Sequence, residues 1–243
     1  MTRGTWESDG AQAHAVQRPD GQWYLRLPDR TDTWPGLIES IARDTGGPLV
    51  TTEPEASDRE SALRACGMVP RRRSRRWTIP VPPRGMRTGA LPEPAEPSHH
   101  TLISLADADL VRVADLDNAL RAEIPGTVGW RGTAADLDDD MSTDAFDPAL
   151  YLVARDDRTG AYDGLVRAWH NPDGPRLGCI GVRPQWRGPR LTVALLAAVG
   201  HVLADRGYEA VTAETDEENL PAVRLARRLG AHPGPVDVEW FRR

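Results

Sequence analysis

The chain has 243 residues, of which 40% are hydrophobic and 27% charged, so it can bury a sizeable core and is not predicted to be disordered. Its 30 basic and 36 acidic residues give a net charge of −6, which disfavours a nucleic-acid partner. No run of about 18 apolar residues predicts a membrane span. The first ten residues lack the apolar core of a secretory signal, and two cysteines cannot build a disulfide framework. These features predict a cytoplasmic protein without a membrane partner.

The first ninety residues carry helix and strand signals. Gly46 is predicted to end a helix and to precede a strand at 48–53. Ser57 and Glu60 have the spacing of a capping box at the start of the next helix. The run Arg-Arg-Arg-Ser-Arg-Arg at 71–76 predicts an edge strand whose charges oppose aggregation, with a phosphate or nucleic-acid grip as the alternative.

A proline-rich stretch, Thr-Gly-Ala-Leu-Pro-Glu-Pro-Ala-Glu-Pro-Ser-His-His, divides the chain. Its composition predicts a linker at 88–100, between an N-terminal domain at 1–87 and a C-terminal domain at 101–243. His99 and His100 close the linker without a cysteine or an acidic residue at ligand spacing, so no metal site is expected there.

The C-terminal part alternates strand and helix signals. The residues Asn-Pro-Asp-Gly after His170 predict a hairpin turn between two antiparallel strands. Asn219 is expected to cap a helix that Gly230 ends. The expected strands are 101–105, 150–155, 164–170, 177–182, 209–214 and 236–241, and the expected helices are 109–123, 191–206 and 219–229. This order predicts an α/β fold with mixed strand directions.

The two halves share an internal repeat. Gly46 and Gly207, 161 residues apart, each end a helix before a similar strand, Pro-Leu-Val-Thr-Thr-Glu or Glu-Ala-Val-Thr-Ala-Glu. Gly67 and Gly230 lie 163 residues apart, as do Trp77 and Trp240. Residues 36–81 are therefore interpreted as a degenerate copy of 197–243.

One segment predicts a chemical function. The strand that ends at Val182 leads through Arg187-Gly188 into an amphipathic helix. Backbone N–H groups in such a turn, together with the positive end of the helix dipole, form an anion site that suits a pyrophosphate. Taken alone, a turn with one glycine is weak evidence.

The surrounding residues resemble the GNAT superfamily of acyl-CoA-dependent N-acetyltransferases. In that family a strand ending in Val-x-Pro leads to Arg-Gly-x-Gly-x-Gly and then Ala-Leu-Leu, and a second element reads Asn-x-x-Ala-x-x-Leu before Leu-Gly. The residues that match are Val182, Pro184, Arg187, Gly188, Ala194, Leu195 and Leu196, followed by Asn219, Ala222, Leu225, Leu229 and Gly230. The resemblance covers about 101–243, and weakly 20–81 as a smaller, degenerate copy without the phosphate loop. The tandem arrangement resembles that of mycothiol synthases.

The resemblance implies a mixed α/β (α+β) fold, with a mostly antiparallel twisted sheet flanked by helices, and acetyl-CoA as acyl donor. Its pantetheine arm would lie between strands 177–182 and 209–214, near Asn219. An amide between Ile180 and Val182 would hold the thioester carbonyl. The pyrophosphate would bind amides of the following residues: Arg187, Gly188, Arg190, Leu191 and Thr192.

The sequence departs from the family pattern. Arg190 and Thr192 replace two loop glycines, and Pro189 has no N–H, although Arg190 could pair with a phosphate and Thr192 could cap the helix. Ala226 stands where the family has a tyrosine acid, and Arg176 where many members have a glutamate base.

Two residues could accept the proton of the attacking amine. They are His170, which the hairpin turn places beside Arg176, and Glu214, at the end of the next strand. Both are equally open to interpretation as ordinary, solvated strand-end residues.

The acceptor side is predicted from charge. Residues 131–157 contain eight Asp and two Arg, which would attract a cationic amine if the segment is not simply a solvated acidic loop. The segment 124–130 resembles the acceptor region of actinobacterial-type GNAT members. Candidate substrate contacts are Asp138, Asp139 and Asp140, with Trp130 and Trp169 (and Trp186) either lining an apolar slot or packing in the core.

Two functions follow from these patterns. The first is N-acetylation of a primary amine on a small, cationic acceptor by acetyl-CoA. The alternative is an inactive GNAT-fold module that senses acyl-CoA or binds a protein partner, since fold alone does not establish activity. The oligomeric state is left open.

Overall fold

The computed structural model describes residues 2–82, 99–127 and 129–243, and it divides into two compact units. Unit 1 comprises the described residues of Met1–Arg75, Pro125–Arg131 and Pro235–Arg243. Unit 2 comprises those of Arg76–Ile124 and Gly132–Gly234. Most of the predicted linker, 88–98, lies outside the described residues, and the predicted domain boundary stays a prediction.

Unit 1 contains a sheet in the order β1-β2-β3-β4-β11. Its helices bury Trp34, Leu37 and Ile41 of α1 and Leu63 of α2 against the sheet. The elements are β1 (Arg3–Ser8), β2 (Ala11–Gln17), β3 (Trp23–Arg26), η1 (Thr31–Thr33), α1 (Trp34–Thr45), β4 (Leu49–Pro54), α2 (Glu60–Ala65) and the first part of β5 (Val69–Pro80), with the end of β11 (His232–Arg242).

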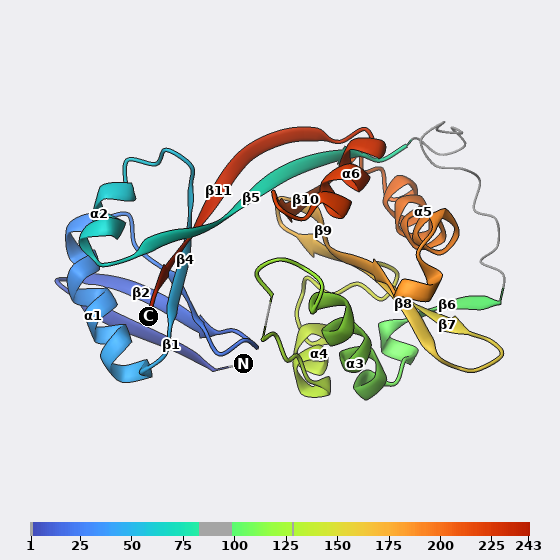
Figure 1. The fold of residues 1–243 in the computed structure, drawn as a ribbon, viewed down its shortest axis with the longest axis horizontal. Helices are drawn as coiled ribbons and strands as arrows, with labels where there is room; N and C mark the ends of the chain where they lie inside the picture. Colours follow the sequence, from blue (N-terminus) through green and yellow to red (C-terminus); the bar gives the residue numbers. More distant parts are fainter. Residues whose placement is uncertain (1, 83–98, 128) are drawn as a thin grey trace. The chain divides into compact units, whose positions relative to one another are not determined.

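Unit 2 contains a sheet in the order β5-β10-β9-β8-β7-β6. Its elements are β6 (His100–Ser104), η2 (Leu105–Asp107), α3 (Leu110–Arg121), α4 (Ala134–Met141), β7 (Tyr151–Asp156), β8 (Tyr162–Asn171), β9 (Gly174–Val182), η3 (Pro184–Trp186), α5 (Pro189–Asp205), β10 (Ala210–Asp216) and α6 (Leu220–Arg228). Helices α3 and α4 lie on one side of strands β7 to β9, and α5 lies on the other (Figure 1). The fold is thus the predicted mixed α/β sheet flanked by helices.

The two faces of this sheet have separate cores, which follow from the alternation of side chains along each strand. Val166 and Ala168 of β8 pack with Leu195 and Val199 of α5. Leu165 of β8 and Cys179 of β9 instead pack among α3 and α4 residues. A residue's position along a strand therefore decides whether its side chain faces α5 or faces α3 and α4.

The repeat is visible in the order of elements. Three strands, a helix, a strand, a helix and a strand occur as β1 to β5 and again as β7 to β11. The last strand of each copy pairs with the other copy's sheet: β11 pairs with β4, and β5 is the neighbour of β10. The Trp77 indole N–H accordingly donates to the Thr215 hydroxyl at 2.8 Å. Each copy thus completes the sheet of the other.

Three local predictions are wrong, and the alternative that the acidic segment is only a loop is wrong as well. Ser57 and Glu60 form no capping box, because α2 begins at Glu60 and the Ser57 hydroxyl accepts from the N–H of Arg59 at 3.2 Å. The arginine-rich strand β5 is not an edge strand, because β11 and β10 flank it. Thr192 does not cap α5, whose N-cap is Gly188. The acidic segment is not all loop, since Thr133 and Asp136 form a capping box that begins α4.

The remaining C-terminal elements lie within a few residues of their predicted bounds. The hairpin forms as predicted, with Asn171 paired to Gly174, and Asn219 caps α6 through its bond to the Ala222 N–H at 3.3 Å. No helix in the described part of the chain has the length and apolarity that a membrane span requires.

Candidate active site

Strands β9 and β10 of unit 2 pair only over a short stretch. Their parallel register joins Arg176 to Thr212 and Leu177 to Ala213. Strand β9 then continues to Val182 without a further β10 partner in the register. The two strands therefore diverge toward the C-terminal end of β9, which leaves the β10-facing edge of its backbone without a strand partner.

A β-bulge coincides with the point of divergence. On β8, the neighbours Arg167 and Ala168 pair with Cys179 and Leu177, so Gly178 is the extra residue on β9. A bulge bends the strand that carries it and increases its twist. Gly178 is exposed, and a Cβ there would stand 2.8 Å from the Trp169 indole nitrogen. A side chain at position 178 would therefore require the Trp169 ring or the backbone to shift.

The β9 residues proposed to contact the acyl donor contribute backbone rather than side chain. The Val182 side chain is buried in the core formed with α5, and the Ile180 side chain packs against that core. Their amides lie past the divergence, where a strand-like pantetheine arm could bond to them. Strands β9 and β10 thus lack register pairs over the stretch where the slot was predicted, and binding of a pantetheine arm there stays a prediction.

The N-terminus of α5 follows directly. Helix α5 has 17 residues and begins with Pro189, so the N–H groups of Gly188, Arg190 and Leu191 have no helical acceptor. The Arg187 N–H is already bonded to the Pro184 carbonyl at 3.2 Å. Three donors and the helix dipole remain for an anion, which is fewer than predicted.

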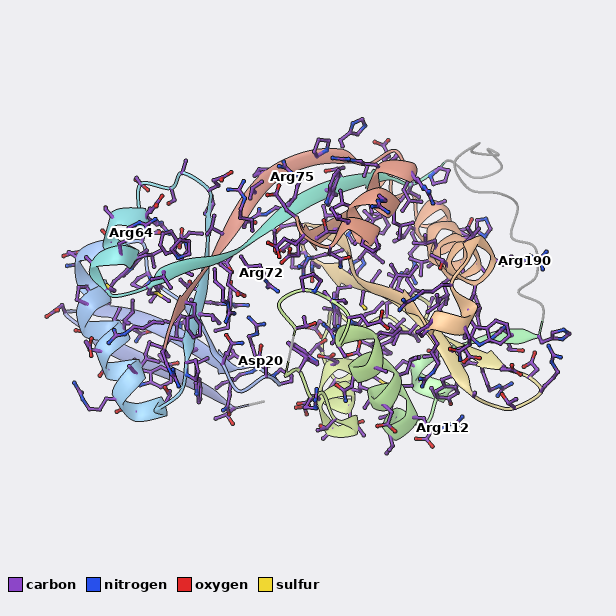
Figure 2. All side chains as sticks on the ribbon, viewed as in Figure 1. Asp20, Arg64, Arg72, Arg75, Arg112 and Arg190 are labelled. Atoms are coloured by element: carbon purple, nitrogen blue, oxygen red, sulfur yellow. The ribbon has the colours of Figure 1, made fainter. Side chains whose placement is uncertain are left out.

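The side chains at this turn serve different purposes. Arg187 forms an ion pair with Glu123, and Leu191 is buried in the core. Arg190 is exposed, and its side chain extends from the first turn of α5 away from the sheet (Figure 2). Of the two arginines, Arg190 is therefore the one whose guanidinium can reach a ligand without breaking an ion pair.

The two candidate bases lie on opposite faces of the sheet. Glu214 alternates with the core residues Val211 and Ala213, so it faces the α3/α4 side, where it forms an ion pair with Arg176 at 3.1 Å. His170 lies on the α5 side, and its Nδ1 is 3.2 Å from the Tyr208 hydroxyl.

Register also separates the two bases. His170 pairs with Pro175, three positions before the bulge, whereas Glu214 directly follows the last residue of β10 that pairs with β9. They are therefore on the order of 10 Å apart. The fold places Glu214 beside the opening, and His170 near the hairpin at the other end of β9. The sequence places His170 beside Arg176 along the hairpin, but the two side chains lie on opposite faces of the sheet.

The predicted acceptor residues also separate. Asp138 and Asp139 are exposed on α4, while Asp140 points inward and accepts from Arg167 at 3.3 Å. Burial raises the pKa of Asp140, although the Arg167 charge opposes this. Trp169 shares the α3/α4 face and packs over the Arg167 guanidinium at 4.9 Å. Trp130 belongs to unit 1, where Arg18 lies over its ring at 5.9 Å.

Beneath Trp169 lies a buried polar cluster that the sequence did not reveal. Arg167 also lies over the ring of Tyr151, whose hydroxyl is buried without a hydrogen bond, as are Arg167 Nε and Asp117 Oδ1. The other Asp117 oxygen accepts from Arg121 at 2.6 Å. Burial raises the pKa of both Tyr151 and Cys179. The Cys179 thiol is thus a core group, and no signal in the sequence joined these distant positions.

The expectation that His100 lacks acidic neighbours is wrong. Its imidazole Nε2–H donates to Asp163 at 3.1 Å, and the ligand-type atoms of His100, Asp156 and Asp163 lie within 4.8 Å of one another. Strands β6, β7 and β8 bring the three together, and all are buried. Spacing along the chain could not show this, because the three residues span more than sixty positions.

Solved structures share this architecture. A tandem GNAT protein from the clavulanic acid biosynthesis pathway superposes with a TM-score of 0.70 at 18% identity, covering 99% of this chain and 82% of the other. A GCN5-related N-acetyltransferase from Sphaerobacter thermophilus has a TM-score of 0.64 at 23% identity, covering 96% and 78%. The fold is thus that of tandem GNAT proteins.

Sequence comparison identifies the family of residues 116–231. Residues 116–231 match the profile of the acetyltransferase (GNAT) family. A mycothiol acetyltransferase of Clavibacter sepedonicus is 37% identical over 116 residues, covering 46% of this chain and 36% of the relative. One from Arthrobacter sp. strain FB24 is 35% identical over 160 residues, covering 56% and 49%. Residues 116–231 therefore form a GNAT acetyltransferase domain, and the chain spans half or less of the length of these relatives.

Proposed function

We propose that the protein is an N-acetyltransferase that transfers the acetyl group of acetyl-CoA to a primary amine within a ternary complex. Two neighbouring features carry the proposal. The first is the opening at Gly178, where β9 and β10 cease to pair. The second is the set of N–H groups of Gly188, Arg190 and Leu191 at the start of α5, which follows the end of β9. The first feature suits an extended pantetheine arm, and the second suits a pyrophosphate. Both belong to unit 2 and to the GNAT domain.

The reaction needs a neutral amine. Glu214 is the proposed base, directly or through water, because it lies beside the opening and on the α3/α4 face. The amine nitrogen attacks the thioester carbonyl, and a C–N bond forms while an amide between Ile180 and Val182 stabilises the oxyanion. Collapse breaks the C–S bond and releases the thiolate of CoA. The position of the family's tyrosine acid is Ala226, which is 4% exposed in the core, so the thiolate, with a pKa of about 8.5, leaves without that donor.

The proposed acceptor is a small molecule with a cationic amine. Exposed Asp138 and Asp139 on α4 support this, because anionic side chains near a site raise the local concentration of cations. The names of the relatives make a mycothiol-type amine one member of the test panel, beside polyamines, aminoglycosides, amino acids and basic peptides. A cytoplasmic location and the absence of a nucleic-acid partner remain predictions.

Two observations favour the alternative, an inactive GNAT-fold module that senses acyl-CoA or binds a protein. Pro189 removes a loop donor, and the tyrosine acid is missing at Ala226. The enzyme would release CoA from acetyl-CoA when an amine is present, whereas the inactive module would not.

The deciding experiment measures amine-dependent CoA release with a thiol reagent across the panel, alongside calorimetric titration of acetyl-CoA. Release with at least one amine supports the enzyme, and Glu214→Gln then lowers the rate at least about a hundredfold without changing acetyl-CoA affinity. His170→Gln is the matched control and keeps the rate. Binding without turnover for any amine supports the sensor, and neither binding nor turnover contradicts both acyl-CoA functions.

A further inference from the structure

A buried hydrogen-bonded pair lies next to the segment from Arg187 to Leu191 in unit 2, which is called the cofactor loop below. The side chains of His100 on β6 and Asp163 on β8 are 2% and 4% exposed, and they bond to each other at 3.1 Å. Asp156 on β7 is the third buried member, but its Oδ1 accepts the N–H groups of Arg158 and Thr159 at 2.8 and 3.1 Å. Asp156 thus shapes its own turn, and Asp163 is the partner that orients the His100 ring.

The His100 ring supports Trp186. The two rings meet edge to face, with centroids 4.6 Å apart and planes at 88°. Trp186 is the last residue of η3, and Arg187 and Gly188 follow it directly. Edge-to-face contact is one of the preferred arrangements of aromatic rings. The contact therefore fixes the residue from which the cofactor loop departs.

The other end of η3 is fastened to the same part of β8. The Arg183 N–H donates to the Asp163 carbonyl at 2.7 Å, and Arg183 Nε donates to the Tyr162 carbonyl at 2.9 Å. The guanidinium also lies 3.9 Å from the Asp163 carboxylate. Asp163 thus connects both ends of the segment 183–186, one through its backbone and one through His100.

Besides the Arg187 bonds to Glu123 and to the Pro184 carbonyl and the buried Leu191 side chain, the loop is open to solvent. Arg187 and Gly188 are exposed, and a Cβ at Gly188 would meet no atom within 4 Å. Binding geometry that depends on backbone amides is only as well defined as the packing that holds the backbone. In the described structure, the side-chain packing just before the loop is that of Trp186.

We propose that His100 is a positioning residue for the cofactor loop. Asp163 orients its imidazole, its ring holds Trp186, and Trp186 sets the place of the Gly188, Arg190 and Leu191 amides that receive the acetyl-CoA pyrophosphate. His100 does not touch acetyl-CoA. The inference rests on the proposed function, because it assigns a support to the loop that binds the acyl donor.

The test separates loop positioning from general stability. Titration calorimetry gives the Kd of acetyl-CoA, and steady-state kinetics gives KM for each substrate. We expect Trp186→Ala and His100→Ala to raise the Kd and KM of acetyl-CoA about tenfold while KM of the amine stays unchanged. Trp186→Phe, which keeps a ring against His100, should restore most of the affinity.

Ile103→Ala is the control, because Ile103 lies on the same strand and packs against the core on the α3/α4 side, whereas Trp186 packs against the core on the α5 side. It should lower thermal stability without changing the Kd. The inference is overturned if the wild type binds acetyl-CoA and the His100 and Trp186 variants bind equally well, or if Ile103→Ala raises the Kd as much as they do. Absence of binding by the wild type would instead overturn the proposed function.

Discussion

Leu177 and Ala213 form the last residue pair that holds β9 and β10 together. The next residue on β9, Gly178, is the bulge that turns this strand away from its neighbour. The opening therefore originates at one glycine, and the side chain that restricts this glycine is Trp169.

Replacing Gly178 with alanine tests this origin. A Cβ 2.8 Å from the Trp169 indole must displace the ring or flatten the bulge. We expect Gly178→Ala to lower the free energy of unfolding by about 1–3 kcal/mol, as overpacking does, and to weaken acetyl-CoA binding. The control is Gly200→Ala within α5, where a Cβ meets no atom within 4 Å and alanine should stabilise the helix by about 1 kcal/mol. Urea unfolding and calorimetry measure both, and unchanged affinity in Gly178→Ala would contradict the role of the bulge.

Charge at the start of α5 gives a second prediction. Arg190 is exposed and free to reach a phosphate, so Arg190→Glu should weaken acetyl-CoA binding at least about tenfold, or 1.4 kcal/mol. The unfolding midpoint should not move. Arg3→Glu on β1 of unit 1 makes the same charge change and should leave affinity unchanged. Equal affinity of wild type and Arg190→Glu in a titration would show that this guanidinium lies away from the phosphates.

The acidic face of α4 predicts acceptor selectivity. The double variant Asp138→Asn, Asp139→Asn should raise KM for a polycationic amine several-fold without affecting KM of acetyl-CoA. The effect should shrink as salt increases, because exposed charges are screened. By contrast, Asp140→Asn should reduce stability, because it leaves the buried Arg167 without its carboxylate. A salt-independent KM in the double variant would argue against electrostatic attraction of the acceptor.

Unit 1 contains an acid-sensitive ion cluster. Glu239, whose side chain is 6% exposed, accepts from Arg18, Arg71 and Arg72 at 3.0–3.1 Å. Burial would raise the pKa of this carboxyl, but the Arg71 hydrogen bond and the three positive charges outweigh it and lower the pKa below 4.5. The folded-state pKa is thus below the unfolded one, so the cluster stabilises the fold above the unfolded value and loses this contribution as pH falls through the folded value.

Glu239→Gln should therefore cost about 3 kcal/mol at pH 7, as loss of one partner of a buried ion cluster does. The difference from the wild type should shrink as the pH falls below about 4. Urea unfolding at pH 7, 5 and 3 measures it. A difference that stays the same at all three pH values would contradict the account of this cluster.

Local rules predicted much of the C-terminal fold, because its elements carry their own signals. Asn219 caps a helix, Asn-Pro-Asp-Gly makes a hairpin, and the Val182–Gly188 segment links strand to helix in the described structure. The arginine-rich strand β5 was misassigned for a physical reason. Its charges resemble those of an edge, yet Glu239 pairs with Arg71 and Arg72, and Glu55 pairs with Arg73. Glu239 lies 168 positions from Arg71, so local sequence patterns do not indicate this pairing.

In the candidate site, too, local sequence patterns predicted some features and missed those that depend on strand pairing. The turn from Arg187-Gly188 into α5 is a local motif that the sequence predicts, whereas the Gly178 bulge depends on the register between β8 and β9. The bond between His100 and Asp163 joins strands that are 63 positions apart in the chain. The face of Glu214 follows from alternation once the core residues Val211 and Ala213 are known. These three features depend on how residues pair across strands, which residue types along the chain do not indicate.

The central claim is that main-chain amides at the start of α5 grip the acetyl-CoA pyrophosphate. An NMR titration of the isotopically labelled protein with acetyl-CoA, and in parallel with acetyl-pantetheine, follows these amides individually. We expect the Gly188, Arg190 and Leu191 signals to shift saturably with acetyl-CoA and far less with acetyl-pantetheine, while Gly10 of unit 1 stays unmoved. Saturable binding of acetyl-CoA that leaves these three signals in place would contradict the claim.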